Sequence, residues 1–222
     1  MNPLIVALDV SSLDEATALA RRIGDAVGGF KVGLELFSAE GPRAVSAIEG
    51  PVFLDLKLHD IPTTVARALR ALDVLAPWMV NVHALGGRAM LEAAVEAKPS
   101  PTKLLAVTIL TSLGDADLKE LGLPPAGESV PLLASLAVET GCDGVVCAPE
   151  DAATVRSVVP EGFLIVTPGV RPATDGMDEH ARGATPRAAI DAGADYIVVG
   201  RPVTRADDPR AAAAAIAQDV AR

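Results

Sequence analysis

Charged residues interrupt the apolar segments of this 222-residue chain at regular places. Asp55 and Lys57 stand two positions apart at the end of an apolar run, so on a strand their side chains would share one face. Lys31 lies in the preceding apolar run, and Asp60 follows Lys57 closely. A lone charge at a strand end is often part of a salt bridge, but a buried ion network contributes little to stability. The alternating charges therefore predict a site that acts on a substrate rather than a structural ion network.

Glycine and arginine residues follow two later apolar runs. Gly200 and Arg201 come directly after one run, and Gly169 and Arg171 come after another. A glycine lets the backbone approach a ligand closely, and an arginine can hold a phosphate through two hydrogen bonds. The two places together indicate a ligand that carries a phosphate.

Possible metal ligands lie close to the alternating charges in the sequence. They are Asp55, His59, Asp60 and His83. A dication bound among them would have to tolerate two lysines in the same place, so we predict no metal site. For His83 a strand-end hydrogen bond is the simpler interpretation, and His59 is left without a role.

Short apolar runs alternate regularly with longer, alanine-rich segments. Runs of Val, Ile, Leu and Ala are typical of strands that are buried on both faces of a parallel sheet. The expected strands are 4–9, 29–36, 52–57, 78–84, 103–110, 143–148, 163–167 and 194–200. The expected helices are 13–27, 39–49, 62–76, 87–97, 129–140, 150–158, 185–192 and 207–220. Ser12, Ser129 and Thr185 are the expected helix N-caps.

Eight β–α units in a chain of this length match a compact barrel. We predict an α/β fold, a single-domain (β/α)8 TIM barrel over residues 1–222. The alternative is an open, doubly wound sheet, but six strands would suffice there and no Gly-x-Gly-x-x-Gly follows the first run. The long connections 114–129 and 171–183 both follow strands, which places them at the carboxyl end of a barrel, where active sites lie.

The composition limits the partners and the location of the protein. The formal net charge of −10 argues against a general surface for nucleic acid or for anionic lipid. Two cysteines cannot form a disulfide framework, and Cys142 and Cys147 are expected to be buried thiols on opposite faces of a strand. The first apolar run is too short for a signal peptide, and no apolar stretch would span a membrane. We therefore expect a soluble, cytoplasmic protein.

Five motifs of this sequence together resemble the orotidine 5′-phosphate decarboxylase family. They are Phe-Lys-Val-Gly at 30–33, Asp-Leu-Lys-Leu-His-Asp-Ile-Pro-Thr-Thr at 55–64, Thr-Ser at 111–112, Pro-Gly-Val-Arg at 168–171 and Val-Gly-Arg-Pro at 199–202. The resemblance covers essentially the whole chain. It implies a TIM barrel that decarboxylates orotidine 5′-monophosphate (OMP) to UMP and CO2 without a cofactor, as the last step of de novo pyrimidine nucleotide biosynthesis.

The resemblance also implies catalytic roles for residues of the 55–64 motif and for Lys31. Lys57 would donate a proton to C6 of the pyrimidine as CO2 leaves. Asp55 would lie beside the departing carboxylate, and Lys31 would bridge the charges and reach the ribose. Asp60 and Thr64 would enter the site of a neighbouring subunit, which implies a homodimer with shared active sites.

Substrate-binding roles follow from the same resemblance. Asp9 would bind the ribose hydroxyls, and Thr111 would contact the pyrimidine edge. Gly200 and Arg201 would bind the phosphate, with Arg171 in the same region.

One position departs from the family pattern. His180 stands where the family usually has a glutamine that contacts the phosphate. An imidazole can still donate a hydrogen bond, so His180 is expected to bind the substrate.

Two other functions remain as alternatives. A metal-dependent enzyme of the same superfamily, a decarboxylase or aldolase acting on a keto-sugar phosphate, would need a carboxylate on the second strand, where Lys31 stands. A catalytically silent phosphate-binding or interface protein would be expected to have lost at least one of the alternating charges.

Overall fold

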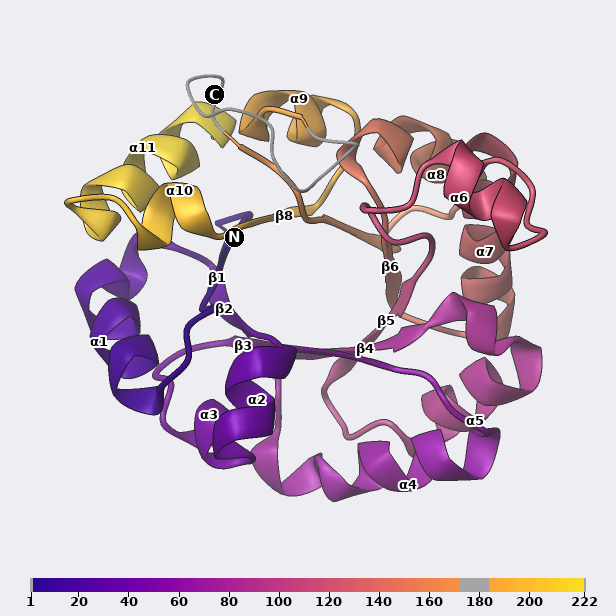
Figure 1. Cartoon of the computed structure of the whole chain (residues 1–222), viewed down its shortest axis with the longest axis horizontal. Coiled ribbons are helices and arrows are strands. Elements are labelled where there is room, and N and C mark those ends of the chain that lie inside the picture. Colours follow the sequence, from indigo (N-terminus) through magenta and orange to yellow (C-terminus); the bar gives the residue numbers. More distant parts are fainter. Residues whose placement is uncertain (1, 172–183, 222) are drawn as a thin grey trace.

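Eight parallel strands form a closed barrel in this protein, whose structure, a computed structural model, describes residues 2–171 and 184–221. Each strand pairs with the next along the chain, and β1 pairs with β8 to close the ring (Figure 1). The strands are β1 (Leu4–Ala7), β2 (Gly29–Val32), β3 (Val52–Leu58), β4 (Met79–His83), β5 (Lys103–Val107), β6 (Gly144–Val146), β7 (Leu164–Thr167) and β8 (Tyr196–Val199). The predicted TIM barrel is confirmed.

Helices surround the ring of strands (Figure 1). The α-helices are α1 (Leu13–Ile23), α2 (Leu34–Glu40), α3 (Arg43–Ser46), α4 (Pro62–Ala71), α5 (Arg88–Ala97), α6 (Asp115–Glu120), α7 (Ala126–Thr140), α8 (Ala152–Val158), α9 (Pro186–Asp191), α10 (Arg201–Thr204) and α11 (Pro209–Val220). The 3-10 turns are η1 (Gly24–Ala26), η2 (Asp73–Leu75), η3 (Ala84–Gly86) and η4 (Pro149–Asp151). Within the described residues, no helix is both long enough and apolar enough to cross a membrane.

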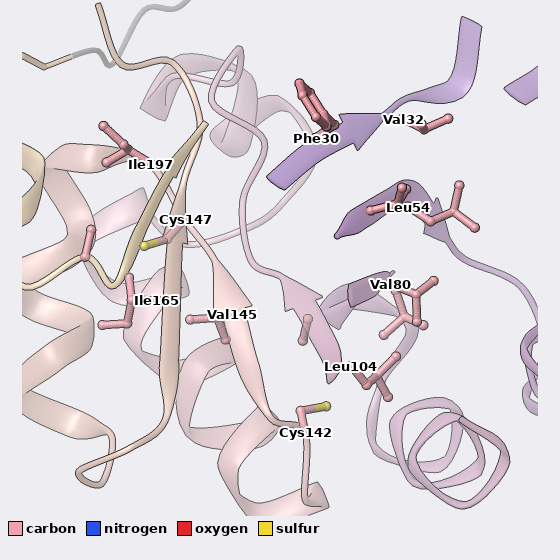
Figure 2. Close-up of a cluster of buried hydrophobic side chains, with 14 of the residues drawn as sticks. Phe30, Val32, Leu54, Val80, Leu104, Cys142, Val145, Cys147, Ile165 and Ile197 are labelled. Atoms are coloured by element: carbon pink, nitrogen blue, oxygen red, sulfur yellow. The ribbon is translucent and has the colours of Figure 1, made fainter. Parts of the chain in front are cut away.

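The strands bury side chains on both faces and thereby form two apolar clusters. Side chains such as Val32, Leu54 and Ile165 point outward and pack under the helices (Figure 2). Ile5, Phe53 and other inward-facing side chains fill the barrel interior. This double burial explains the near-continuous apolar sequence of the strands.

The thiols of Cys142 and Cys147 are both buried, as expected. They do not lie on opposite faces, because both belong to the outer cluster (Figure 2). Cys142 precedes β6, so the alternation of a strand does not extend to it. The prediction of opposite faces was therefore wrong.

Two of the three expected N-caps are confirmed. The Ser12 hydroxyl accepts a hydrogen bond from the Glu15 N–H, and the Thr185 hydroxyl accepts one from the Ala188 N–H. Ser129 does not cap a helix, because α7 begins earlier and the Ser129 hydroxyl donates to the Pro124 carbonyl.

Several element boundaries also differ from those predicted, and the helix expected over 39–49 is instead the end of α2 followed by the short helix α3. The strand expected over 29–36 ends at Val32, and α2 begins at Leu34, because a short apolar run can form either a strand or a helix. The long connection 114–129 contains α6 and the first residues of α7.

Candidate active site

A cavity of about 590 Å³ opens at the carboxyl ends of the strands. Its deepest walls come from inward-facing residues of β1, β3, β6 and β8, and its rim comes from the loops and helices that follow the strands. The lining residues that the sequence singled out are Asp9, Lys31, Asp55, Lys57, Thr111, Arg171, Gly200 and Arg201. The barrel thus brings together charges that are far apart in the sequence.

Lys31, Asp55 and Lys57 form a continuous array of charges inside the cavity, and Asp9 extends this array. The Asp55 carboxylate lies between two ammonium groups: Lys57 Nζ is 2.7 Å from Oδ1, and Lys31 Nζ is 3.4 Å from Oδ2. Lys31 Nζ also lies 2.8 Å from Asp9 Oδ1. The side chains of Lys31 and Asp55 are largely buried, whereas those of Lys57 and Asp9 remain accessible. Both lysines line the cavity, and Lys57 is the more accessible of the two cations.

The array keeps Lys31 and Asp55 charged despite their burial. Burial alone would raise the pKa of the Asp55 carboxyl, but the charges of Lys31 and Lys57 and the hydrogen bonds from Lys57 and Asn81 together outweigh it and lower the pKa below its usual 3.8. Burial alone would lower the pKa of the Lys31 ammonium, but Asp55 and Asp9 raise it above its usual 10.5. At neutral pH the cavity therefore presents fixed charges of both signs.

The backbone of Lys57 adopts a left-handed conformation with a φ of 50°. This conformation costs a non-glycine residue about 1–3 kcal/mol and is found mostly at functional sites. It coincides with a shift in the pairing of β3 with β4 between Leu54 and Leu58. The Lys57 N–H donates to the Asn81 side-chain oxygen at 2.7 Å, and the Asn81 amide nitrogen donates to Asp55 Oδ1 at 2.7 Å.

Gly33 provides the space that Lys31 occupies. It is the N-cap of α2, directly after β2. A Cβ at Gly33 would stand 2.9 Å from Lys31 Nζ and 3.0 Å from Asp9 Oδ1. Any other residue would therefore press on the Lys31–Asp9 pair.

The groups expected to bind phosphate line the opposite wall of the cavity from β3. Arg171 follows β7, and Gly200 and Arg201 join β8 to α10. Thr111 follows β5 and lines the same cavity. These positions agree with the sequence prediction of one shared site, while His180 lies outside the described residues.

Asp60 and Thr64 do not join the cavity of their own chain. Both are exposed, and Asp60 Oδ1 accepts a hydrogen bond from the Ile61 N–H at 2.7 Å. Asp60 is therefore not part of the array in its own chain, because β3 ends at Leu58 and Asp60 lies beyond it, and its place in the site of a second copy stays a prediction.

His59 and His83 stack on each other beside the array, with ring centroids 5.3 Å apart. Burial, together with the charges of His59 and Lys57, lowers the pKa of His83 to about 4, so its imidazole is neutral at pH 7. His83 Nδ1 accepts a hydrogen bond from the Leu85 N–H, as the strand-end interpretation predicted. Within residues 2–171 and 184–221, no group of three or more His, Cys, Asp or Glu side chains could hold a metal ion.

Sequence reasoning missed Asn81. Its signal was present, because Asn81 and His83 are two polar residues, two positions apart, in an otherwise apolar strand. Such residues share one face of a strand, as Asp55 and Lys57 do.

Comparisons with known proteins agree on one family. The model described as "Orotidine 5′-phosphate decarboxylase / HUMPS family" matches residues 2–216. Orotidine 5′-phosphate decarboxylase of Halorhodospira halophila is 52% identical over 225 aligned residues, which cover 98% of this chain and 95% of that protein. The protein of the same name from Thermobifida fusca is 50% identical, with coverage of 98% and 95%.

A similar solved structure is the crystal structure of orotidine 5′-phosphate decarboxylase from Lactobacillus acidophilus. It superposes with a TM-score of 0.87 at 38% sequence identity, and the match covers 100% of both chains. The likeness therefore includes every strand and helix that lines the cavity.

Proposed function

The chain belongs to the orotidine 5′-phosphate decarboxylase / HUMPS family, and we propose that it is a carboxy-lyase that converts OMP to UMP and CO2 without a cofactor. One observation carries the proposal: the Lys31–Asp55–Lys57 array opens into the same cavity as Arg171 and Arg201. A substrate with an anionic reacting centre at one end and a phosphate at the other fits this distribution of charge.

In the proposed reaction the bond between C6 and the carboxylate breaks, and its electron pair stays on C6 as CO2 leaves. The Lys57 ammonium then transfers a proton to C6, and the lysine recovers a proton from water. A cation held beside C6 stabilises the negative charge that develops there, and this effect is largest where water is excluded. The attraction grows toward the transition state, which is what catalysis requires.

Asp55 has two roles in this proposal. Its carboxylate orients the Lys57 ammonium through their 2.7 Å contact. The charge of Asp55 would also stand beside the substrate carboxylate, and repulsion between them would favour the loss of CO2. Lys31 bridges Asp55 and Asp9 and is proposed to reach the ribose.

The remaining groups of the cavity are proposed to hold the parts of the substrate that do not react. Asp9 would accept hydrogen bonds from the ribose hydroxyls, and Thr111 would contact the pyrimidine edge. Gly200, Arg201 and Arg171 would bind the phosphate. Binding energy gained at the phosphate would help to place C6 against Lys57. His180 stays a proposed donor to the phosphate.

We further propose a homodimer in which Asp60 and Thr64 enter the site of the partner. Both residues are exposed and lie outside the cavity of their own chain. The apolar side chain of Ile61, between them in the sequence, is 64% exposed, and that of Leu34 after β2 is 55% exposed. A second copy of the chain would cover these side chains.

The proposed partners are small nucleotides and a second copy, with no nucleic acid or membrane, and the proposed location is the cytoplasm. The net charge of −10 supports the exclusion of nucleic acid and of anionic membranes, because it would repel polyanions. Cys142 and Cys147 are buried and form no disulfide, which is compatible with a reducing compartment.

The metal-dependent alternative requires a different side chain on β2. An enzyme that holds Mg²⁺ to stabilise an enediolate needs a carboxylate there, whereas the charged side chain of β2 that lines the cavity is Lys31. This observation favours the decarboxylase.

The proposed function is tested by the ultraviolet absorbance of OMP mixed with purified protein in excess EDTA. We expect rapid loss of the orotate chromophore, with UMP as the product. Turnover only after Mg²⁺ is added would contradict the proposal. An absence of turnover under both conditions, from folded protein that binds UMP, would favour a non-catalytic protein.

A further inference from the structure

We propose that Asn81 is a positioning residue for the decarboxylation, because its side-chain amide holds the Lys57 backbone and the Asp55 carboxylate in one fixed arrangement. The inference rests on the proposed function, and it adds a residue that does not itself touch the substrate. Asn81 is fully buried, with an exposed fraction of 0%, and it lies on β4, the neighbour of the strand that carries Lys57.

The two hydrogen bonds of Asn81 fix the orientation of its amide. The side-chain oxygen accepts from the Lys57 N–H, and the side-chain nitrogen donates to Asp55 Oδ1. The reversed amide would place N–H against N–H and oxygen against a carboxylate, so only one orientation satisfies both partners. Each end of the amide therefore serves a different catalytic group.

The pairing of β3 with β4 explains why a side chain is needed here. Leu54 pairs with Val80 and Leu58 pairs with Val82, so residues 55–57 of β3 lie opposite Asn81 alone. The extra residues bend β3 away from regular pairing, as a bulge does. At this bend the Lys57 N–H finds its acceptor on the Asn81 side chain rather than on the β4 backbone.

The bend gives Lys57 the left-handed backbone that aims its side chain at Asp55. The φ of 50° is unfavourable for lysine and persists only where the surroundings hold it. Without the Asn81 acceptor, the Lys57 backbone could relax and carry its ammonium away from Oδ1 of Asp55. A displacement of about 1 Å at a reacting group is enough to lower a rate about 100-fold.

Asn81 is absent from the described residues that line the cavity. Its loss should therefore lower turnover and leave substrate binding nearly unchanged, a pattern that a merely structural residue would not give. If Asn81 served stability alone, its replacement would lower the amount of folded protein. The protein that remained folded would then keep its normal kcat.

The test uses Asn81→Leu, which has a similar volume and no hydrogen bonds, in the full-length protein. We expect kcat to fall about 10- to 100-fold, as is typical when a supporting contact of an active site is lost, with KM within about threefold of the wild-type value. Thr102→Val is the matched control, because Thr102 is buried and donates one hydrogen bond, to the Pro77 carbonyl, at the amino end of the barrel. This control should keep kcat within about twofold.

A second variant supplies a pH signature. Asn81→Asp keeps an acceptor for the Lys57 N–H but places a carboxylate against Asp55 when it is ionised. Once protonated, the new carboxyl can donate to Asp55 as the amide does. We expect its deficit in kcat relative to wild type to shrink as the pH is lowered, whereas the deficit of Asn81→Leu should stay constant.

A readout that needs no activity separates this inference from the proposed function. Hydrogen exchange of the Lys57 amide, followed by NMR, should be at least about tenfold faster in Asn81→Leu than in wild type. Unchanged exchange, an unchanged kcat, or an equal loss of kcat in Thr102→Val would each overturn the positioning role. If the wild type itself left OMP unchanged, the proposed function would fail, while the exchange rate would still decide whether Asn81 holds Lys57.

Discussion

Each end of the barrel holds an aspartate between two lysines. At the carboxyl end, Asp55 pairs with Lys31 and Lys57. At the amino end, Asp143 pairs with Lys98 and with Lys103, whose Nζ is 3.3 Å from Asp143 Oδ1. We call these the carboxyl-end cluster and the amino-end cluster. They contain the same residue types, so residue type alone does not separate a catalytic group from a structural one.

The two clusters differ in what else the aspartate binds. Asp143 also accepts the Leu104 backbone N–H at 2.9 Å, so it ties the start of β6 to β5. Asp55 accepts from the side chains of Lys57 and Asn81 and opens into the large cavity. An aspartate that holds backbone stabilises the fold, whereas one that orients a reachable ammonium serves chemistry.

The largest effect that separates the clusters is expected from Lys57→Ala. Removal of the proposed proton donor should lower kcat by about 10²- to 10⁴-fold, while the folded protein still binds UMP in calorimetry. Lys103→Ala removes the equivalent lysine of the amino-end cluster and should keep kcat within about twofold. Substantial decarboxylation by Lys57→Ala, or a similar loss in both variants, would contradict the assignment.

A mixing experiment tests whether a second copy completes the carboxyl-end cluster. Asp60→Asn and Lys57→Ala are each expected to be inactive as pure dimers. In a random equal mixture half of the dimers are mixed, and each would contain one complete site, so about one quarter of the wild-type activity should return. Mixed dimers confirmed by mass spectrometry but without activity would show that Asp60 acts within its own chain.

The sequence predicted the barrel and most of the cavity for identifiable reasons. The alternation of apolar runs with helical segments defines the strands, and the spacing of Asp55 and Lys57 places both on one face. These features are local. The role of Asn81 depends on how β3 pairs with β4, and a shift in pairing between strands leaves no pattern in either sequence.

Local reasoning also failed where a short segment had two possible structures. Leu34 was assigned to a strand, but it begins α2. Asp60 is close to Lys57 in sequence, yet it does not line the cavity of its own chain, because β3 already ends at Leu58. The amino-end cluster escaped notice because Asp143 lies 45 residues after Lys98 and 40 residues after Lys103, and only the closed barrel brings them together.

A smaller effect on the carboxyl-end cluster is expected from Gly33→Ala. The new Cβ would stand 2.9 Å from Lys31 Nζ, so this flexible side chain would have to move away from Asp9. Because the φ of Gly33 is −95°, alanine fits the backbone, and the protein should fold normally. We expect a loss of about tenfold in kcat/KM, since active groups must be held within about 0.5 Å. Gly114→Ala, at the N-cap of α6, is the control, because a Cβ there would meet only Asp117 Oδ2, at an ordinary contact distance of 3.7 Å. Equal activity of both variants would show that Lys31 tolerates displacement.

The smallest effect on turnover, and a clear effect on stability, is expected from Asp143→Asn. Burial alone would raise the pKa of Asp143, but the hydrogen bonds from Lys98 and the Leu104 N–H outweigh it, so the pKa lies below its usual 3.8. A carboxyl with a lowered pKa stabilises the folded state at pH values above its pKa in the unfolded state. This contribution disappears as the pH falls through the pKa of the folded state.

The free energy of unfolding, measured in urea, should therefore be about 1–2 kcal/mol lower in the variant at pH 7, because a charge-assisted hydrogen bond is lost. The difference between the two proteins should be smaller below about pH 4. The kcat should remain within about twofold of wild type. A large loss of kcat in a folded Asp143→Asn protein would mean that the two ends of the barrel are coupled, and the distinction between a structural and a catalytic aspartate would then fail.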